Sequence, residues 1–387
     1  MQPAQRMNFI PFTPFRKVFE EAARREAAGE KIIHLEMGRP DFDTPAHIKD
    51  AATRALAEGK VHYTSNYGIP ELRSAISAKF KADNGLEYDP ADEIIVTVGA
   101  TEGILMSMMA MLNPEDEVLI PAPSFPCYTR CAHMAGAVPV SIPLKEENGF
   151  VPQVEDVRSR INAKSRMLVI NTPNNPTGAV YDPQVMEALA ELAVAEDLIV
   201  LADEIYEKNI YEGIPHCSIA VFPGMKERTI TLNGFSKSYS MTGWRLGYLA
   251  SGREMIAALI RIRQYATVCP TSFAQYGAVE ALEGSQECVA EMMAEFDRRR
   301  LMVMDRLQAM PGISFVKPRG AFYVFINTAK LDKTPQEIVE ALMDEAKITA
   351  VPWGARHIRI SYANSYENLA KAMDALERVL VRWCGND

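Results

Sequence analysis

The stretch TLNGFSKSYSMTGWRLGY, residues 231–248, holds the most unusual arrangement of residues in the chain. An apolar run of β-type residues ends at Gly234, a Ser-Lys pair follows after Phe235, and Arg245 stands eight positions after Lys237. Cations in so apolar a setting need partners, because burying an unpaired charge is costly. We therefore interpret this stretch as the end of a buried strand that leads into a functional site.

Length and composition define the class of protein. At 387 residues, with 48% hydrophobic and 24% charged residues, the chain is an ordinary globular sequence long enough for two domains. A formal charge of −9 offers no basic face for nucleic acid and no polybasic patch for anionic lipid. The first residues lack the apolar core expected of a signal peptide, and no apolar run approaches the length of about 20 residues that a membrane span needs. With six scattered cysteines, the sequence predicts reduced thiols and a cytoplasmic location.

The sequence predicts no metal site. Cys127 and Cys131 have a suggestive spacing, but no third or fourth ligand follows nearby, so we interpret them as ordinary thiols. The six histidines form no HxxxH or HExxH pattern, which argues against zinc chemistry.

Short aliphatic runs alternate with helical patterns through the middle of the chain. Nearly continuous apolar strands between helices indicate a mostly parallel sheet covered on both faces, and hence an α/β fold. Asp182 and Pro183 predict the N-cap and first position of one helix. The expected strands are 93–98, 117–123, 166–172, 198–204, 228–234 and 244–250, and the expected helices include 101–112 and 182–198.

The two ends of the chain differ from the middle. Residues 15–29 and 285–310 have the pattern of long amphipathic helices, and 321–327 and 357–363 that of strands. We expect a smaller α+β domain built from both termini. The predicted division is 1–45 and 285–387 for the small domain and 46–284 for the large one.

Unusual residues collect where the predicted strands end. Ligands of open α/β sheets bind at the carboxyl ends of the strands, so side chains placed there are expected to meet at one edge. Five strands with polar residues at this edge predict a binding site. These residues are Gly99, Ala100 and Thr101, then Ser124 and Phe125, then 174–178, then Asp203 and Tyr206, and finally Ser236 and Lys237.

Each of these residues also has a purely structural interpretation. Asp203, at the end of an apolar strand, either faces a cation or caps a helix. Lys237 is either a desolvated, nucleophilic amine or an exposed lysine in a turn. Arg245 either binds a phosphate or forms a structural salt bridge. Gly99 to Thr101 form either an anion site at a helix start or a simple turn.

Taken together, these residues fit one cofactor, pyridoxal 5′-phosphate. It needs an amine for a Schiff base, an acid against its ring nitrogen, a phosphate cradle and an aromatic face. An ionised carboxylate keeps the ring nitrogen protonated, so that the ring can accept electrons. The amine is Lys237, the acid Asp203 and the aromatic face Phe125, and the phosphate cradle consists of Gly99, Ala100, Thr101, Ser236 and Arg245.

With these residues in place, the sequence resembles the fold-type I, class I pyridoxal-phosphate aminotransferases, of the aspartate and aromatic type. The likeness extends from GRPDFDTP (38–45) to RISYA (359–363). The motifs between them are HYTSNYGIPELR, VTVGATEG, NTPNNPTG, LADEIY and NGFSKSYSMTGWRLGY, in that order.

The resemblance implies a role for each residue around the cofactor. Lys237 would be the Schiff-base lysine and would then move the proton between the substrate Cα and the cofactor. Asp203 would bind the ring nitrogen, while Asn175 and Tyr206 would donate to the phenolic oxygen. Phe125 would stack on the ring.

It also implies a substrate site and a partner. Arg359 would grip the substrate α-carboxylate, and Gly38 would lie beside the substrate. Tyr63 would reach the phosphate of a neighbouring subunit, so a homodimer with shared sites is expected. The reaction would be a ping-pong exchange between an amino acid and a 2-oxo acid, with the small domain closing over the substrate.

Two departures from the family pattern concern specificity. Thr101 stands where some aspartate-preferring members carry a lysine, and the loop 351–358 before Arg359 is short, with Trp353 in place of a common glycine. Together with Phe12 and Phe15, Trp353 favours aromatic or other hydrophobic substrates over aspartate, although an aspartate aminotransferase stays possible. Two further hypotheses compete with this one. The first is a β- or γ-lyase or cyclopropane-forming synthase of the same fold, and the second is a non-enzymatic cofactor-binding regulator.

Overall fold

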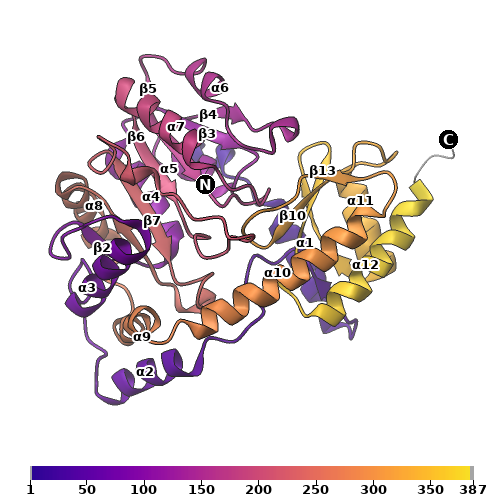
Figure 1. The fold of residues 1–387 in the computed structure, drawn as a ribbon, viewed down its shortest axis with the longest axis horizontal. Helices are drawn as coiled ribbons and strands as arrows, with labels where there is room; N and C mark the ends of the chain where they lie inside the picture. The colour runs from indigo at the N-terminus through magenta and orange to yellow at the C-terminus, as the bar shows by residue number, and fades with distance from the viewer. Residues whose placement is uncertain (1, 384–387) are drawn as a thin grey trace.

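The computed structural model describes residues 2–383 and divides into a large unit and a smaller one (Figure 1). The large unit is built around a seven-stranded sheet and the smaller one around a four-stranded sheet. In Figure 1 the long helix α10 (Glu287–Gln308) runs from the large unit into the smaller one. The same helix therefore contributes to both units.

The large sheet has the strand order β2-β8-β7-β6-β5-β3-β4. Strand β8 is antiparallel to both neighbours, and the other neighbouring pairs are parallel. The predicted α/β fold with a mostly parallel sheet is confirmed. The strands are β2 (Ile94–Thr97), β3 (Glu117–Ala122), β4 (Val138–Pro143), β5 (Ser165–Asn171), β6 (Ile199–Asp203), β7 (Thr229–Gly234) and β8 (Gly247–Ala250).

Helices cover both faces of this sheet, as continuous apolar strands require. In β6, Ile199 and Leu201 pack on the face covered by α4, α5 and α8, whereas Val200 and Ala202 pack on the face covered by α7. Further along, α3 and α9 complete the cover, and α2 packs on α9. These helices are α2 (Ala46–Ala57), α3 (Pro70–Lys79), α4 (Gly99–Met111), α5 (Cys127–Met134), α6 (Val154–Arg158), α7 (Pro183–Ala195), α8 (Arg253–Ala266) and α9 (Ser272–Glu283).

Strand β4 was not among the expected strands. It lies at the edge of the sheet and pairs only with β3. Its sequence, VPVSIP, contains two prolines and is only partly buried. An edge strand tolerates proline because one side of its backbone needs no ladder hydrogen bonds. The sequence therefore lacks the apolar run that identified the inner strands.

The smaller unit combines both ends of the chain. Its antiparallel sheet has the order β12-β13-β10-β9, and β1 pairs in parallel with β11 beside it. Residues from both termini share one core, with Val18 and Leu35 packed among residues beyond 290. The elements are α1 (Pro14–Ala27), β1 (Ile33–His34), β9 (Ser314–Phe315), β10 (Tyr323–Asn327), α11 (Pro335–Ala341), β11 (Ile348–Thr349), β12 (Val351–Trp353), β13 (His357–Ser361) and α12 (Tyr366–Leu380).

Short helical turns connect these elements. The N-cap of α7 differs from the prediction. Asp182 is the N-cap residue of α7 and Pro183 its first residue, but the Asp182 side chain makes no cap bond. Its carboxylate instead pairs with Arg319 of the smaller unit, at 3.2 Å. The connecting turns are η1 (Gln5–Phe9), η2 (Phe80–Asn84), η3 (Glu146–Asn148), η4 (Ile219–Val221), η5 (Thr242–Trp244), η6 (Leu342–Ala346) and η7 (Val381–Trp383).

We propose the domain division 1–45, 46–284 and 285–387, which the two separate sheets support. Residues 5–9 are an exception, because the Phe9 ring stacks on His133 of α5 in the large unit, with ring centroids 5.1 Å apart. None of the helices in residues 2–383 combines the length and the apolar composition needed to cross a bilayer.

Candidate active site

A cavity of about 850 Å³ lies where the strands of the large sheet end and the smaller unit begins. This position and volume are typical of ligand sites in open α/β sheets. The predicted residues that line it are Gly38, Ala100, Thr101, Ser124, Phe125, Asn175, Asp203, Tyr206, Ser236, Lys237, Arg245 and Arg359. Gly99, predicted as part of the phosphate cradle, is buried and is not among the residues that line the cavity.

Asp203 ends strand β6 and is 4% exposed. One carboxylate oxygen accepts the Tyr128 hydroxyl at 2.7 Å and the other accepts the Ile205 amide at 3.2 Å. Burial raises the pKa of Asp203 to about 6, although both donors oppose the shift. No lysine or arginine of residues 2–383 forms an ion pair with it. A buried carboxylate without a cationic partner is suited to bind a positively charged atom of a ligand, such as a protonated ring nitrogen.

Tyr128 was missed from the sequence. It is fully buried in α5, and its hydroxyl is the only side-chain donor to Asp203 among the described residues. Three positions before it, Phe125 meets its ring edge-on, with centroids 5.8 Å apart. Nothing in the sequence signals this role, because a tyrosine among apolar residues is ordinary core until its hydroxyl is seen to meet a partner.

Lys237 follows β7 and reaches the cavity with its amine. The amine donates to the Gly38 carbonyl at 2.5 Å. Burial, followed by repulsion from Arg359 and Arg245, lowers the pKa of Lys237 to about 8, while Asp203 opposes the shift. Near neutral pH a useful fraction of this amine is therefore uncharged and nucleophilic. The structural interpretation, an exposed lysine in a turn, does not apply.

Arg359 lies on β13 and is 6% exposed. It donates to the Asn175 side chain at 2.9 Å and to the Glu36 carbonyl at 2.7 Å, and its guanidinium lies 4.4 Å from the centre of the Tyr323 ring. Its Nε has no partner, and no carboxylate in residues 2–383 pairs with it. A buried arginine with free donors fits a carboxylate ligand.

Tyr323 is the second residue that the sequence did not reveal. Its hydroxyl is 2.8 Å from that of Tyr206, and it lies under Arg359. Burial raises the pKa of Tyr206 well above its usual range, so this hydroxyl stays protonated and able to donate. The pair joins the predicted cofactor residues to the predicted substrate residue.

A cradle for an anion forms at the start of α4. Gly99 has φ +72°, a left-handed conformation that favours glycine, and no side chain caps the helix. Gly247 lets this turn lie against β8, since a Cβ at 247 would be 2.8 Å from the Ala100 nitrogen. The exposed Arg245 donates to the Thr242 carbonyl at 3.0 Å and has no acidic partner among residues 2–383. Free amide groups beside a free cation fit a phosphate.

Two predicted residues lie outside the cavity, and the cysteine pair lies at its edge. The Tyr63 side chain is 88% exposed, as a residue meant for a neighbouring subunit would be. The placement of Phe12 in the substrate pocket is wrong, because it is 71% exposed and lies against Arg16, whereas Phe15 and Trp353 do line the cavity. Cys127 and Cys131 are free thiols, with their sulfur atoms 3.5 Å apart.

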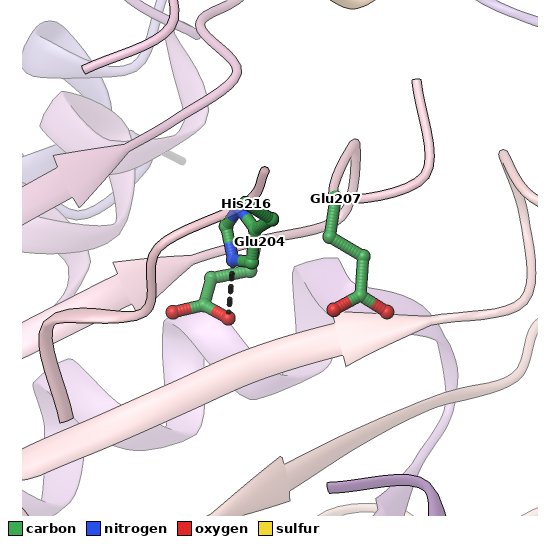
Figure 2. A group of neighbouring side chains, drawn as sticks. All are labelled: Glu204, Glu207 and His216. Atoms are coloured by element: carbon green, nitrogen blue, oxygen red, sulfur yellow. Dashed lines mark hydrogen bonds and ion pairs between the residues drawn. The ribbon is translucent and has the colours of Figure 1, made fainter. Parts of the chain in front are cut away.

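Behind Asp203, Glu204 and Glu207 lie next to His216 (Figure 2). The His216 ring is 2.9 Å from Glu204, and the Ser218 hydroxyl donates to the same carboxylate at 2.6 Å. Glu207 forms an ion pair with Lys79. Although burial opposes it, the two carboxylates raise the pKa of His216. Both carboxylates thus have partners within the protein, and we interpret the group as an ion-pair network that fixes the segment after Asp203.

The chain is similar throughout to known aminotransferases. Residues 30–376 match the family model described as aminotransferase class I and II. The aromatic-amino-acid aminotransferase 2 of Thermococcus litoralis and the aspartate aminotransferase of Pyrococcus abyssi are both 44% identical to it over 388 residues, which is 98% of each sequence.

Solved structures agree with the sequence comparisons. The aspartate aminotransferase of Thermus thermophilus with maleate superposes with a TM-score of 0.94 at 40% identity, over 98% of this chain and all of that one. The aromatic aminotransferase of Pyrococcus horikoshii OT3 gives 0.89 at 43% identity, over 93% of this chain and 99% of that one. The family expected from the motifs is confirmed. The chain therefore belongs to the class I and II aminotransferase family and is an enzyme that uses pyridoxal phosphate.

Proposed function

We propose that this aminotransferase moves the amino group of a hydrophobic, preferably aromatic, L-amino acid to a 2-oxo acid such as 2-oxoglutarate, in ping-pong order. The observation that carries the substrate preference is the apolar wall beside Arg359. Strand β12 pairs with the strand of Arg359 and lines the cavity with Val351, Pro352 and Trp353. Phe15 and Val140 also line it.

The geometry of the cavity supports a role for each of the cofactor residues. Pyridoxal phosphate supplies an aldehyde and an electron-accepting ring. Asp203, held by Tyr128, is placed to keep a ring nitrogen protonated. Lys237 would supply the amine and the base that moves the Cα proton. Asn175 and Tyr206 would donate to a phenolic oxygen, and Phe125 would provide an aromatic face for the ring.

The phosphate is held by the turn at α4 and by neighbouring polar groups. Gly99 shapes the turn, and Ala100 and Thr101 present their amides from the helix start. Ser236 adds a hydroxyl, and Arg245 adds a planar cation that can bind two phosphate oxygens.

Arg359 binds the substrate carboxylate, and the Gly38 carbonyl keeps Lys237 beside the reacting atoms. Because the cavity lies between the two units, movement of the smaller one over it would exclude water during the reaction.

The donor preference is tested by mixing the yellow holoenzyme with single amino acids and following the absorbance of the cofactor. We expect conversion to the amine form to be faster with phenylalanine, tyrosine and leucine than with aspartate, because apolar groups gain from burial against Trp353 and Phe15. Equal or faster conversion with aspartate would reverse the preference. Release of ammonia without an oxo acid would instead indicate a lyase.

One observation favours aspartate or glutamate as a second class of substrate. Arg130 of α5 lines the cavity, donates to the Phe9 carbonyl at 3.0 Å, and has no acidic partner among the described residues. It could therefore receive the side-chain carboxylate that Thr101 cannot bind.

The change Arg130→Met tests this role. It should lower kcat/KM for aspartate, glutamate and 2-oxoglutarate about 10- to 100-fold, the size of one charged hydrogen bond, and leave phenylalanine unchanged. The exposed Arg54→Met variant is the control. Equal losses for phenylalanine and aspartate would show that Arg130 only supports the fold.

The homodimer remains a proposal, and an exposed apolar patch supports it. Tyr63, Tyr265 and Val268 are 88%, 87% and 40% exposed. The Asn66 side chain donates to the Val268 carbonyl at 2.8 Å and joins the two loops. Thr267 donates to Glu102, directly after the phosphate turn. A second copy covering this patch would bring its Tyr63 to the open phosphate site.

We expect a particle of twice 43.0 kDa in sedimentation. Tyr63→Phe should weaken cofactor binding about tenfold, because one hydroxyl donor to the phosphate is lost, without changing the particle mass. Tyr276→Phe is the matched control. A fully active particle of 43.0 kDa would contradict the shared site.

A further inference from the structure

The segment His34–Gly38 contacts both cations of the substrate site. The Glu36 carbonyl accepts from the Arg359 guanidinium at 2.7 Å, and the Gly38 carbonyl accepts from the Lys237 amine at 2.5 Å. The Leu35 carbonyl accepts from the Ser361 amide at 2.7 Å, so the segment runs beside β13. Its position therefore decides where the guanidinium of Arg359 points.

This segment carries a carboxylate that is completely buried. Glu36 is 0% exposed, and its side chain accepts from His34 at 2.8 Å and from the Thr349 hydroxyl. The same hydroxyl accepts the Leu35 amide at 3.0 Å. A buried carboxylate is tolerated when its oxygens are paired, and its partners then hold it in one place. Neither the reaction nor the cofactor uses this carboxylate directly.

His34 joins this carboxylate to the first long helix. Its other ring nitrogen is 3.0 Å from Glu26 of α1. The hydrogen bond that His34 donates to Glu36, opposed by burial and reinforced by Glu26, raises the pKa of His34 to about 9. A charged His34 thus ties α1, whose Phe15 lines the cavity, to the segment that holds Arg359.

We propose that Glu36 and His34 are positioning residues for Arg359, and that they orient its guanidinium toward the substrate carboxylate through the Glu36 carbonyl. This inference rests on the proposed role of Arg359. The titratable groups that face His34 are the carboxylates of Glu26 and Glu36, and the Glu36 carboxylate also accepts from the Thr349 hydroxyl. The variants Glu36→Gln and His34→Gln keep the size of these side chains but remove the ion pair.

The test measures binding of 3-phenylpropionate, which has the carboxylate but no amine, to the holoenzyme by calorimetry between pH 7 and pH 10. Phenethylamine, which lacks the carboxylate, is the matched ligand. At pH 7 we expect both variants to weaken 3-phenylpropionate about tenfold, the loss of one charged interaction, with phenethylamine unchanged. For the amino acid substrate, KM should rise while kcat is retained.

The pH profile separates positioning from folding. In the wild type, affinity for 3-phenylpropionate should fall as the pH passes about 9, where His34 loses its charge. In His34→Gln the step near pH 9 should disappear, whereas any step that comes from the cofactor bound to Lys237 should remain. His34→Lys, which keeps a cation, should restore affinity at pH 9. The Glu30→Gln variant, which loses an ion pair with Lys347 nearby, is the control.

Two results would overturn the inference. One is unchanged 3-phenylpropionate binding in both variants, and the other is a step near pH 9 that persists in His34→Gln. An Arg359→Lys variant distinguishes the premise from the inference. If that variant also binds normally, the role of Arg359 is wrong, whereas if it alone loses affinity, only the positioning role fails.

Discussion

Replacement of Lys237 by alanine is expected to lower kcat by at least about 10⁴-fold, since the nucleophilic amine and the proton carrier are lost together. The fold should survive. Among residues 2–383 the amine has one acceptor, the Gly38 carbonyl, and its removal relieves repulsion with Arg359 and Arg245. Cofactor should still bind without a covalent bond, because Asp203 and the phosphate cradle remain.

Reduction of the holoenzyme with borohydride, followed by peptide mapping, checks this assignment. The pyridoxyl group should appear on Lys237 in the wild type and on no lysine in the variant. Lys226→Ala, which removes a surface ion pair with Glu93, is the matched control and should keep both label and activity. Transamination at the wild-type rate by Lys237→Ala, or a label on another lysine, would remove Lys237 from the mechanism.

The fold could be predicted from the sequence wherever burial requires a continuous run of apolar residues. Strand β6 was expected at 198–204 and spans Ile199–Asp203, because a parallel strand covered on both faces must be apolar throughout. Strand β4 lies at the edge of the sheet, where it pairs only with β3, and it contains two prolines. It therefore need not be apolar throughout, and its sequence did not predict a strand. The side chain of Asp182 was expected to cap α7, but its partner, Arg319, is 137 positions away and only the folded chain reveals it.

The candidate site, like the fold, could be predicted only in part from the sequence. Asp203 and Lys237 could be predicted because each follows an apolar strand and is therefore expected to be buried. A buried charge is costly unless a partner or ligand compensates it. Tyr128 and Tyr323 could not, since an aromatic residue in an apolar stretch is ordinary core until its hydroxyl is seen to meet a partner. Glu36 was hidden for a related reason, because two of its partners, Thr349 and Arg359, lie more than 300 positions away along the chain.

Asp203→Asn is expected to separate activity from stability. Activity should fall about 10³-fold, the size expected for a lost electrostatic contact to the reacting system, because a neutral amide no longer holds a ring nitrogen protonated. The cofactor-free variant should nevertheless be more stable than the cofactor-free wild type at pH 7. The reason is that the wild-type carboxylate is buried, with a pKa raised from 3.8 to about 6, and no cation of residues 2–383 pairs with it.

The sign of this difference follows from proton linkage. Between pH 4 and pH 6 the folded wild type binds more protons at Asp203 than the unfolded chain does, so its free energy of unfolding falls as the pH rises. The loss reaches about 3 kcal/mol above pH 6, by the energy of the pKa shift, and asparagine avoids it. Urea unfolding of the cofactor-free proteins should show a gap that widens from pH 5 to pH 7. Asp197→Asn, at a side chain that is 83% exposed, should show no such gap. A gap that does not change with pH would mean that Asp203 ionises as easily in the folded cofactor-free protein as in the unfolded chain, so that burial does not destabilise its charge.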